Sequence, residues 1–172
     1  AGGHAGTTSP FALMQEIREW FDGPVALSGS IAHGQSILAA QAMGADFAYI
    51  GSAFIATKEA NAVQGYKENI VEAKASDIVY SSLFTGVHGN YLRQSIVKAG
   101  MDPDNLPEGD ISTMNFGSGG NTEAKAWKDI WGSGQGIGAV KEVQSVADMV
   151  GRLEAEYRAA KARLDGAYRK GW

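Results

Sequence analysis

Hydrophobic and polar positions over the first 50 residues alternate between a helical and an extended pattern. A helix is expected to begin at Ser9 and Pro10, because serine is favoured at the N-cap and proline at the first helical position. Short apolar runs at residues 25–27 and 47–50 are typical of buried strands, and a second helix from about residue 33 to 43 is expected to connect them. The apolar stripe of the first helix consists of Phe11, Met14, Ile17 and Phe21.

This order of elements predicts an α/β protein. Short apolar strands that alternate with helices form parallel sheets, in which both faces of each strand are buried. Two strands do not make a stable parallel sheet, and a barrel needs about eight to close. We therefore expect most of the sheet in an N-terminal half that is absent from this sequence. Residues 1–6 have the composition of a loop, with neither an initiator Met nor a signal peptide, which also indicates a fragment of a longer polypeptide.

The pattern becomes helical and less regular beyond residue 57. Residues 61–75 are predicted to form a helix and residues 78–84 an extended segment. Residues 101–107 are rich in turn formers and predict a loop, whereas residues 123–131 predict a short helix.

The last helix has the clearest pattern in the chain. Its apolar positions are spaced three or four residues apart, and Ser145 and Asp148 have the spacing of a capping box at its start. Such a stripe suits a coiled-coil seam or a helix that packs on its own domain, and we expect the second. The stripe consists of Val143, Val146, Val150, Leu153, Tyr157, Ala160 and Leu164.

Composition and charge remove several classes of function. No run approaches the roughly 20 apolar residues that span a bilayer. The 15 Lys and Arg residues nearly balance 19 Asp and Glu residues, and no basic block predicts a nucleic acid or an anionic membrane as partner. The absence of cysteine excludes disulfides, thiolate metal sites and a cysteine nucleophile from these residues, and it fits a cytoplasmic protein. The acidic residues show no metal-ligand spacing.

Two predicted strand ends carry the same pair of small residues, Gly29-Ser30 and Gly51-Ser52. The carboxyl ends of the last two strands of an α/β barrel commonly form a phosphate site. Glycine lets backbone N–H groups approach phosphate oxygens, and the helix that follows adds its positive end and its unpaired N–H donors. Either pair alone is more simply explained as a tight turn, but two matching pairs on consecutive strands favour a phosphate site.

His4 lies among small residues at what is expected to be another strand end. Most isolated histidines are structural or merely exposed. Here the small neighbours Gly3, Ala5 and Gly6 leave room for a ligand beside the imidazole, which can act as a general base or a hydrogen-bond donor near neutral pH. His33 and His88 have weaker claims to a catalytic role.

Four segments in this order resemble the second half of the nitronate monooxygenase family, formerly called 2-nitropropane dioxygenases. They are Ala1-Gly2-Gly3-His4-Ala5-Gly6, Leu27-Ser28-Gly29-Ser30-Ile31-Ala32-His33-Gly34, Met43-Gly44-Ala45-Asp46 and Ile50-Gly51-Ser52-Ala53-Phe54. The strong match covers roughly the first 60 residues. Residues 131–136 also resemble the glycine-rich segment that these enzymes place near the flavin.

The resemblance implies a TIM-type (β/α)8 barrel with FMN at its C-terminal face and a mostly helical extra domain. Residues 1–60 would form the last strands and helices of the FMN-binding barrel, with residues 3–4 at the end of its sixth strand. Residues 61–142 would form the helical domain on the substrate side, and residues 143–172 a helix that packs back on the barrel.

The same resemblance implies the roles of particular residues. His4 would be the catalytic histidine. The residues expected to bind FMN are Gly2, Gly3, Ser28, Gly29, Ser30, Gly51, Ser52, Gln135 and Gly136. The family more usually has Ser-Gly-Gly-Ile-Ala-Asp-Gly and Met-Gly-Thr, so Ser30 replaces a glycine, His33 an aspartate and Ser52 a threonine. Ser52 keeps the hydroxyl, whereas the side chain of Ser30 must point away from a phosphate.

The implied reaction is the FMN-dependent oxidation of an alkyl nitronate or nitroalkane by O2 to a carbonyl compound and nitrite, with a homodimer as a further expectation. His4 would hydrogen-bond the nitro group and take the α-proton from a neutral nitroalkane. The alternatives are a flavin-dependent enoyl-acyl-carrier-protein reductase, which shares the Gly-Gly-His signature, and an NAD(P)H:quinone reductase. A barrel fragment that binds a phosphate ligand without catalysis, and an IMP dehydrogenase-like barrel whose cysteine lies outside these residues, also stay open.

Overall fold

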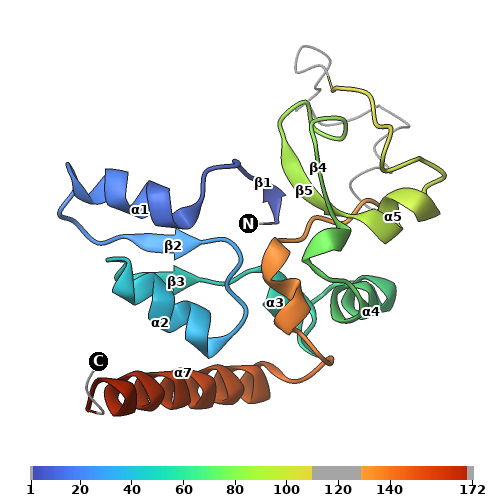
Figure 1. Ribbon diagram of the computed structural model, residues 1–172. Helices are drawn as coiled ribbons and strands as arrows, with labels where there is room; N and C mark the ends of the chain where they lie inside the picture. Colours follow the sequence, from blue (N-terminus) through green and yellow to red (C-terminus); the bar gives the residue numbers. More distant parts are fainter. Residues whose placement is uncertain (1, 110–128, 170–172) are drawn as a thin grey trace.

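Two small β-sheets organise residues 2–109 and 129–169, the part of the chain that the computed structural model describes (Figure 1). Strands β2 (Ala26–Ser28) and β3 (Phe47–Tyr49) form a parallel pair, in which Ala26 lies opposite Phe47. Strands β1 (Gly3–His4), β5 (Gly89–Leu92) and β4 (Ile78–Ser81) form an antiparallel sheet in that order. The segment from residue 129 to the last helix passes between the two sheets.

The parallel pair is built as the sequence predicts. Helix α1 (Pro10–Arg18) starts with Pro10 at its first position, and α2 (Gly34–Ala42) connects β2 to β3. The chain leaves α2 through Gly44, whose φ of +98° suits only glycine without strain. Both helices pack on one face of the pair, where Met14, Leu27, Ala40 and Ala45 form a buried cluster. The predicted strand–helix–strand unit is therefore confirmed.

The second face of the parallel pair differs from the prediction. Both faces were expected to be buried, but the side chains of Phe47 and Tyr49 are 63% and 67% exposed. Side chains alternate along a strand, so only Leu27 and Ala48 point toward the helices. No element among the described residues buries the opposite face, and the barrel is not closed within them.

The first strand also differs from the expectation of a parallel strand beside β2. Residues 3–4 pair antiparallel with β5 instead, with Gly3 opposite Asn90 and His4 opposite Gly89. Gly89 permits this close approach, because a Cβ atom there would lie 2.8 Å from the Gly3 carbonyl oxygen. The edge of β5 thus provides hydrogen-bond partners that the parallel pair does not provide.

The remaining elements are α3 (Ser52–Ile55), α4 (Gln64–Glu72), η1 (Ala75–Asp77), α5 (Arg93–Lys98), η3 (Gln135–Ala139) and α7 (Val146–Arg169). Four of them, α3, α4, η3 and α7, contribute to a second and larger core, whereas Ile96 of α5 lies in a third cluster with Tyr91 and Ile130. The predicted helix over residues 61–75 is found over a shorter range as α4, and the predicted extended segment over residues 78–84 begins as β4. The predicted helix over residues 123–131 lies mostly outside the described residues.

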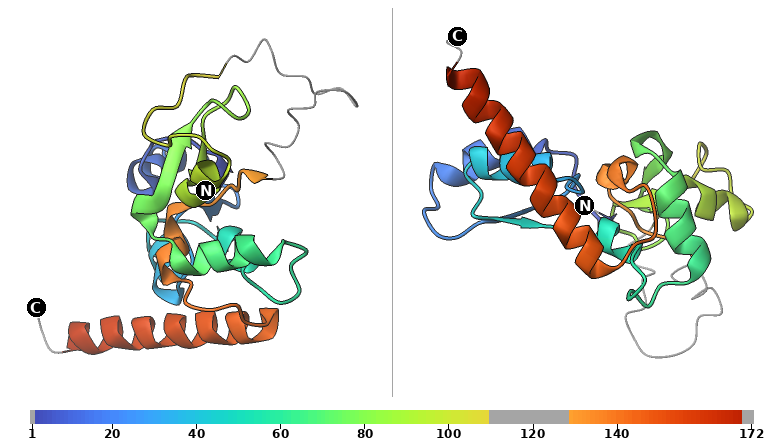
Figure 2. Two further views of the ribbon diagram at one scale, coloured as in Figure 1. Left: turned by 90° about the vertical axis from the view of Figure 1, so that its right-hand side faces the viewer. Right: turned by 90° about the horizontal axis from the view of Figure 1, so that it is seen from below.

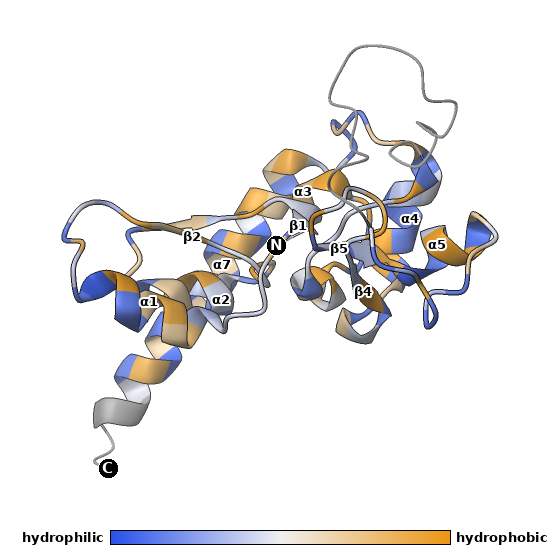
Figure 3. Cartoon of the chain, turned by 90° about the horizontal axis from the view of Figure 1, so that it is seen from above, coloured by the Kyte–Doolittle hydropathy of each residue, from blue (hydrophilic) through white to orange (hydrophobic). Residues whose placement is uncertain are grey.

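Helix α7 packs along α2 of the same chain (Figure 2), as expected for a helix that covers its own domain. The Tyr157 hydroxyl donates to the Gln41 side-chain oxygen at 2.6 Å, and Ser145 caps the helix by accepting from the Asp148 N–H at 3.1 Å. Figure 3 shows the alternation of hydrophobic and hydrophilic residues along α1 and α7. No helix in the described residues has both the length and the apolar character that crossing a membrane requires.

Candidate functional site

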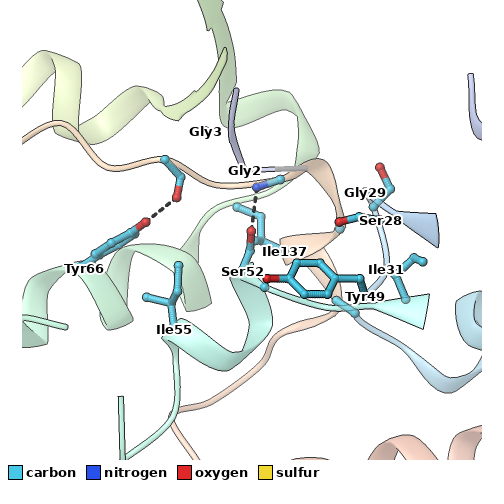
Figure 4. A pocket seen from close by; sticks show the side chains of 16 residues that line it. Gly2, Gly3, Ser28, Gly29, Ile31, Tyr49, Ser52, Ile55, Tyr66 and Ile137 are labelled. Carbon is cyan, nitrogen blue, oxygen red and sulfur yellow. Dashed lines mark hydrogen bonds between the residues drawn. The ribbon is translucent and has the colours of Figure 1, made fainter. Parts of the chain in front are cut away.

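A cavity of about 400 Å³ lies where the ends of β2 and β3 face the glycine-rich segment that follows Trp131 (Figure 4). It joins residues that are far apart in the sequence, because β1, both parallel strand ends and η3 converge on it. Residues from four of the segments that resemble the family line it: Gly2, Gly3, Ser28, Gly29, Ser30, Gly51, Ser52 and Gly136. Gln135 does not line the cavity and its side chain is exposed.

The turn after β2 is shaped by unusual backbone angles. Gly29 has φ +108° and Ser30 has φ +56°, the left-handed region in which a side chain costs about 1–2 kcal/mol. Gly136 packs directly against this turn, since a Cβ atom at Gly136 would lie 2.7 Å from the Ser30 carbonyl carbon. The close approach explains a glycine at position 136, and the exposed Ser30 side chain stands where the family more usually has glycine.

The turn after β3 leaves space beside its backbone. Gly51 lines the cavity, and a Cβ atom added there would meet no atom within 4 Å. The Ser52 hydroxyl oxygen accepts a hydrogen bond of 2.9 Å from the Gly134 N–H. Because the oxygen accepts this bond, the proton of the Ser52 hydroxyl can be donated to another acceptor. An open backbone position beside a hydroxyl donor suits an anionic ligand group such as a phosphate.

Helix α2 contributes less to this cavity than the sequence suggested. The N–H donors of its first turn were expected to face the ligand, but the Gly34 N–H donates to Glu156 Oε2 at 2.8 Å. The Gln35 N–H donates to His33 Nδ1 at 3.1 Å, and the Ser36 N–H donates to the His33 carbonyl oxygen. His33 is therefore the N-cap of α2. The expectation of unpaired N–H donors at the start of this helix is therefore wrong, because Glu156 of α7 and His33 accept hydrogen bonds from them.

His4 lies on β1 directly after the cavity-lining Gly2 and Gly3, but it does not itself line the cavity. Its Nε2 atom is 2.9 Å from the Thr85 hydroxyl oxygen. That hydroxyl donates to the Val87 carbonyl oxygen at 2.8 Å, so it accepts a hydrogen bond from the Nε2–H of His4. Thr85 is buried and thereby fixes both the ring orientation and the tautomer of an exposed histidine.

Tyr66 is a cavity residue that the sequence did not reveal. Its ring stacks on Trp131 with centroids 5.1 Å apart and an interplanar angle of 11°, and its hydroxyl donates to the Gly132 carbonyl oxygen. A tyrosine in an amphipathic helix is usually a core residue, and no motif surrounds this one. Only the packing of α4 against the segment after residue 130 places it at the cavity.

Burial raises the pKa of the Tyr66 phenol from 10.0 to about 12. The phenol therefore stays protonated, and able to donate, throughout the physiological range. Because the folded-state pKa lies above the unfolded value, the stability that this group contributes is complete below pH 10 and is lost as the pH rises through about 12. We expect alkaline titration of tyrosine ultraviolet absorbance to show a late step near pH 12 that Tyr66→Phe removes. A late step that persists in the variant would contradict this assignment.

Fold and cavity together define an α/β protein with a glycine-lined site at the carboxyl ends of two parallel strands. The family model for nitronate monooxygenase matches residues 1–156, and the chain belongs to that family of flavin-dependent oxidoreductases. A nitronate monooxygenase of Paraburkholderia phytofirmans is 28% identical over 180 residues, which cover 95% of this chain and 48% of that protein. The chain spans about half or less of the length of the curated relatives it matches.

Solved structures agree on the fold. A nitroalkane oxidase of Streptomyces ansochromogenes matches with a TM-score of 0.72 and 25% identity, over 95% of this chain and 51% of that chain. FabK of Thermotoga maritima matches with a TM-score of 0.71 and 23% identity, over 97% of this chain and 54% of that chain. At 23% identity, the match to FabK shows that the two chains share a fold. The α/β class predicted from the sequence is therefore confirmed.

Proposed function

We propose that this chain supplies the phosphate side of an FMN site, and the catalytic histidine, of an enzyme that oxidises alkyl nitronates or nitroalkanes with O2. The observation that carries the proposal is the convergence of the two Gly-Ser turns on one cavity. The backbone at Gly51 and the Ser52 hydroxyl would receive the FMN phosphate, with Gly29 and Ser30 on the neighbouring turn. Bound FMN would supply the electron-accepting chemistry.

The rest of the barrel belongs to the same proposal. Phe47 and Tyr49 leave one face of the parallel pair exposed, and the relatives are about twice as long as this chain. Strands supplied by an N-terminal half would cover that face and complete the cofactor site. The activity and flavin-binding experiments proposed here therefore use the full polypeptide that includes this half.

In the proposed reaction His4 acts on the substrate through its imidazole. With the Nε2–H committed to Thr85, the unprotonated Nδ1 would take the α-proton from a neutral nitroalkane, and a ring protonated at Nδ1 would donate a hydrogen bond to the anionic nitro group of a nitronate. Thr85 contributes indirectly, because it holds Nε2 and so fixes the ring before substrate binds. The products of the overall reaction are a carbonyl compound and nitrite.

His4→Ala tests this role. We expect the variant to keep bound FMN and to lose nitronate and nitroalkane turnover by about 100-fold or more, the usual contribution of a positioned acid–base group. His88→Ala is the matched control, because His88 is exposed, stacks on Tyr80 and does not line the cavity. Nitrite release during steady-state turnover measures both variants. Unchanged turnover of both substrate forms by His4→Ala would exclude His4 as the catalytic residue.

The electron donor distinguishes nitronate oxidation from the two reductase alternatives. The flavin-dependent enoyl-acyl-carrier-protein reductase shares the Gly2-Gly3-His4 signature, and its reaction is oxidation of NADPH driven by an enoyl thioester. A quinone reductase would oxidise NADH in the presence of a quinone. Nitrite formation without a nicotinamide would support nitronate oxidation. NADPH oxidation that depends on the thioester would favour the reductase.

A further inference from the structure

Tyr66 is connected to the proposed phosphate site through the glycine-rich segment, residues 132–136. Its hydroxyl donates to the Gly132 carbonyl oxygen, and two residues later the Gly134 N–H donates to the Ser52 hydroxyl oxygen at 2.9 Å. Gly132, Gly134, Ser52 and Tyr66 all line the cavity, and Figure 4 shows both hydrogen bonds at its wall. A continuous series of contacts thus runs from α4 to the Ser52 hydroxyl.

The glycine-rich segment is held on two sides. On one side it pairs with β5, where the Ser133 N–H donates to the Asn90 carbonyl oxygen at 3.1 Å and Gly132 forms a bridge with Tyr91. On the other side the side chains of Tyr66 and Ser52 hold it, from α4 and α3. Glycine has few conformational restraints of its own, so such a segment needs external partners to adopt one conformation.

We propose that Tyr66 is a positioning residue for the cofactor phosphate, an inference that rests on the FMN site proposed above. By fixing the Gly132 carbonyl, the phenol holds the Gly134 N–H against Ser52 and so directs the Ser52 hydroxyl proton into the cavity. Preorganised donors of this kind bind an anion more tightly than donors that must reorient when it arrives. The expected consequence is a contribution to the recognition of the phosphate but not of the flavin ring.

The two parts of the tyrosine can be tested separately. Tyr66→Phe keeps the aromatic ring and its stacking on Trp131, and removes only the hydroxyl that bonds Gly132. Loss of one hydrogen bond costs about 1 kcal/mol, so the variant is expected to fold, which circular dichroism verifies. Tyr157→Phe is the matched control, because it also removes a tyrosine hydroxyl bond, to Gln41, and Tyr157 does not line the cavity.

The decisive comparison is between FMN and riboflavin, which differ only in the phosphate. Flavin fluorescence titration of the apoprotein gives both dissociation constants. We expect Tyr66→Phe to weaken FMN binding about tenfold, the effect of roughly one hydrogen bond, and to leave riboflavin binding within about twofold of wild type. Tyr157→Phe should change neither. Equal weakening of both ligands, or no weakening of FMN, would overturn the positioning role.

A double-variant cycle adds a second test. If Tyr66 acts through Ser52, then Ser52→Ala also removes the contribution of Tyr66 to FMN affinity. The double variant Tyr66→Phe/Ser52→Ala should therefore bind FMN little more weakly than Ser52→Ala alone. Fully additive effects would contradict that route. A wild-type protein that binds FMN no better than riboflavin would overturn the proposed function itself. A wild-type preference for FMN that Tyr66→Phe retains in full would overturn only the inference about Tyr66.

Discussion

Gly34→Ala is expected to destabilise the fold by about 3 kcal/mol, near the upper end of the usual cost of overpacking. A Cβ atom at this position would lie 2.2 Å from the Tyr157 backbone nitrogen and 2.4 Å from the Leu153 carbonyl oxygen. Both contacts are to backbone atoms of α7, which no side-chain rotation can move. The two helices would have to separate.

Separation of α2 and α7 would also break a polar cluster. The Gly34 N–H donates to Glu156 Oε2 at 2.8 Å, and Arg152 of α7 donates to the carbonyl oxygen of Ala32, just before α2, at 3.5 Å. Loss of these contacts would leave partly buried polar groups unsatisfied, which adds to the steric cost. The packing of β2 and β3 is also expected to loosen, since α2 connects the two strands and carries Ala40 of their shared buried cluster.

Urea unfolding followed by circular dichroism measures the change. Gly151→Ala is the control, because Gly151 lies inside α7 where an added Cβ atom meets no atom within 4 Å. That variant should gain about 1 kcal/mol from the helix propensity of alanine. If Gly34→Ala were as stable as wild type, the close packing of α2 on α7 would be wrong.

Gly51→Val is expected to weaken FMN binding by at least about tenfold, or 1.4 kcal/mol, while stability changes by less than about 1 kcal/mol. Gly51 borders the cavity and a Cβ atom added there would meet no protein atom within 4 Å, so the valine side chain is expected to occupy ligand space. This combination separates the binding role of the glycine from a structural one. A glycine required for a tight turn would show the opposite result, a loss of stability.

Gly138→Val is the matched control for Gly51→Val. Gly138 is also open at its Cβ position and also follows one of the segments that form the site, but it does not line the cavity. We expect normal FMN affinity for this variant. Isothermal titration with FMN measures both. Unaltered FMN affinity in Gly51→Val would show that the turn after β3 does not face the cofactor.

Elements set by local sequence were predictable. Pro10 begins α1, Gly44 ends α2 and the apolar runs form β2 and β3, because helix ends and short buried strands depend on neighbouring residues. The convergence of Gly29 and Gly51 on one cavity followed from a general property of parallel strands, whose carboxyl ends lie at one edge.

Features that depend on contacts far apart in sequence were not predictable. Glu156 satisfies the Gly34 N–H from 122 residues away, and no local pattern indicates that partner. Tyr66 lies at the cavity because α4 packs against the segment after residue 130, where its ring stacks on Trp131 and its hydroxyl bonds Gly132, 66 residues later. The exposure of Phe47 and Tyr49 had a different cause, since their apolar character predicts burial and no described element covers them.

The most direct test of the central claim is the visible absorption spectrum of the purified full polypeptide, before and after incubation with FMN. The account predicts flavin bands in the protein fraction, and release of FMN rather than riboflavin on denaturation, because the two Gly-Ser turns would hold the phosphate. A folded protein that stays colourless after incubation with FMN would contradict the claim that this cavity is a flavin site.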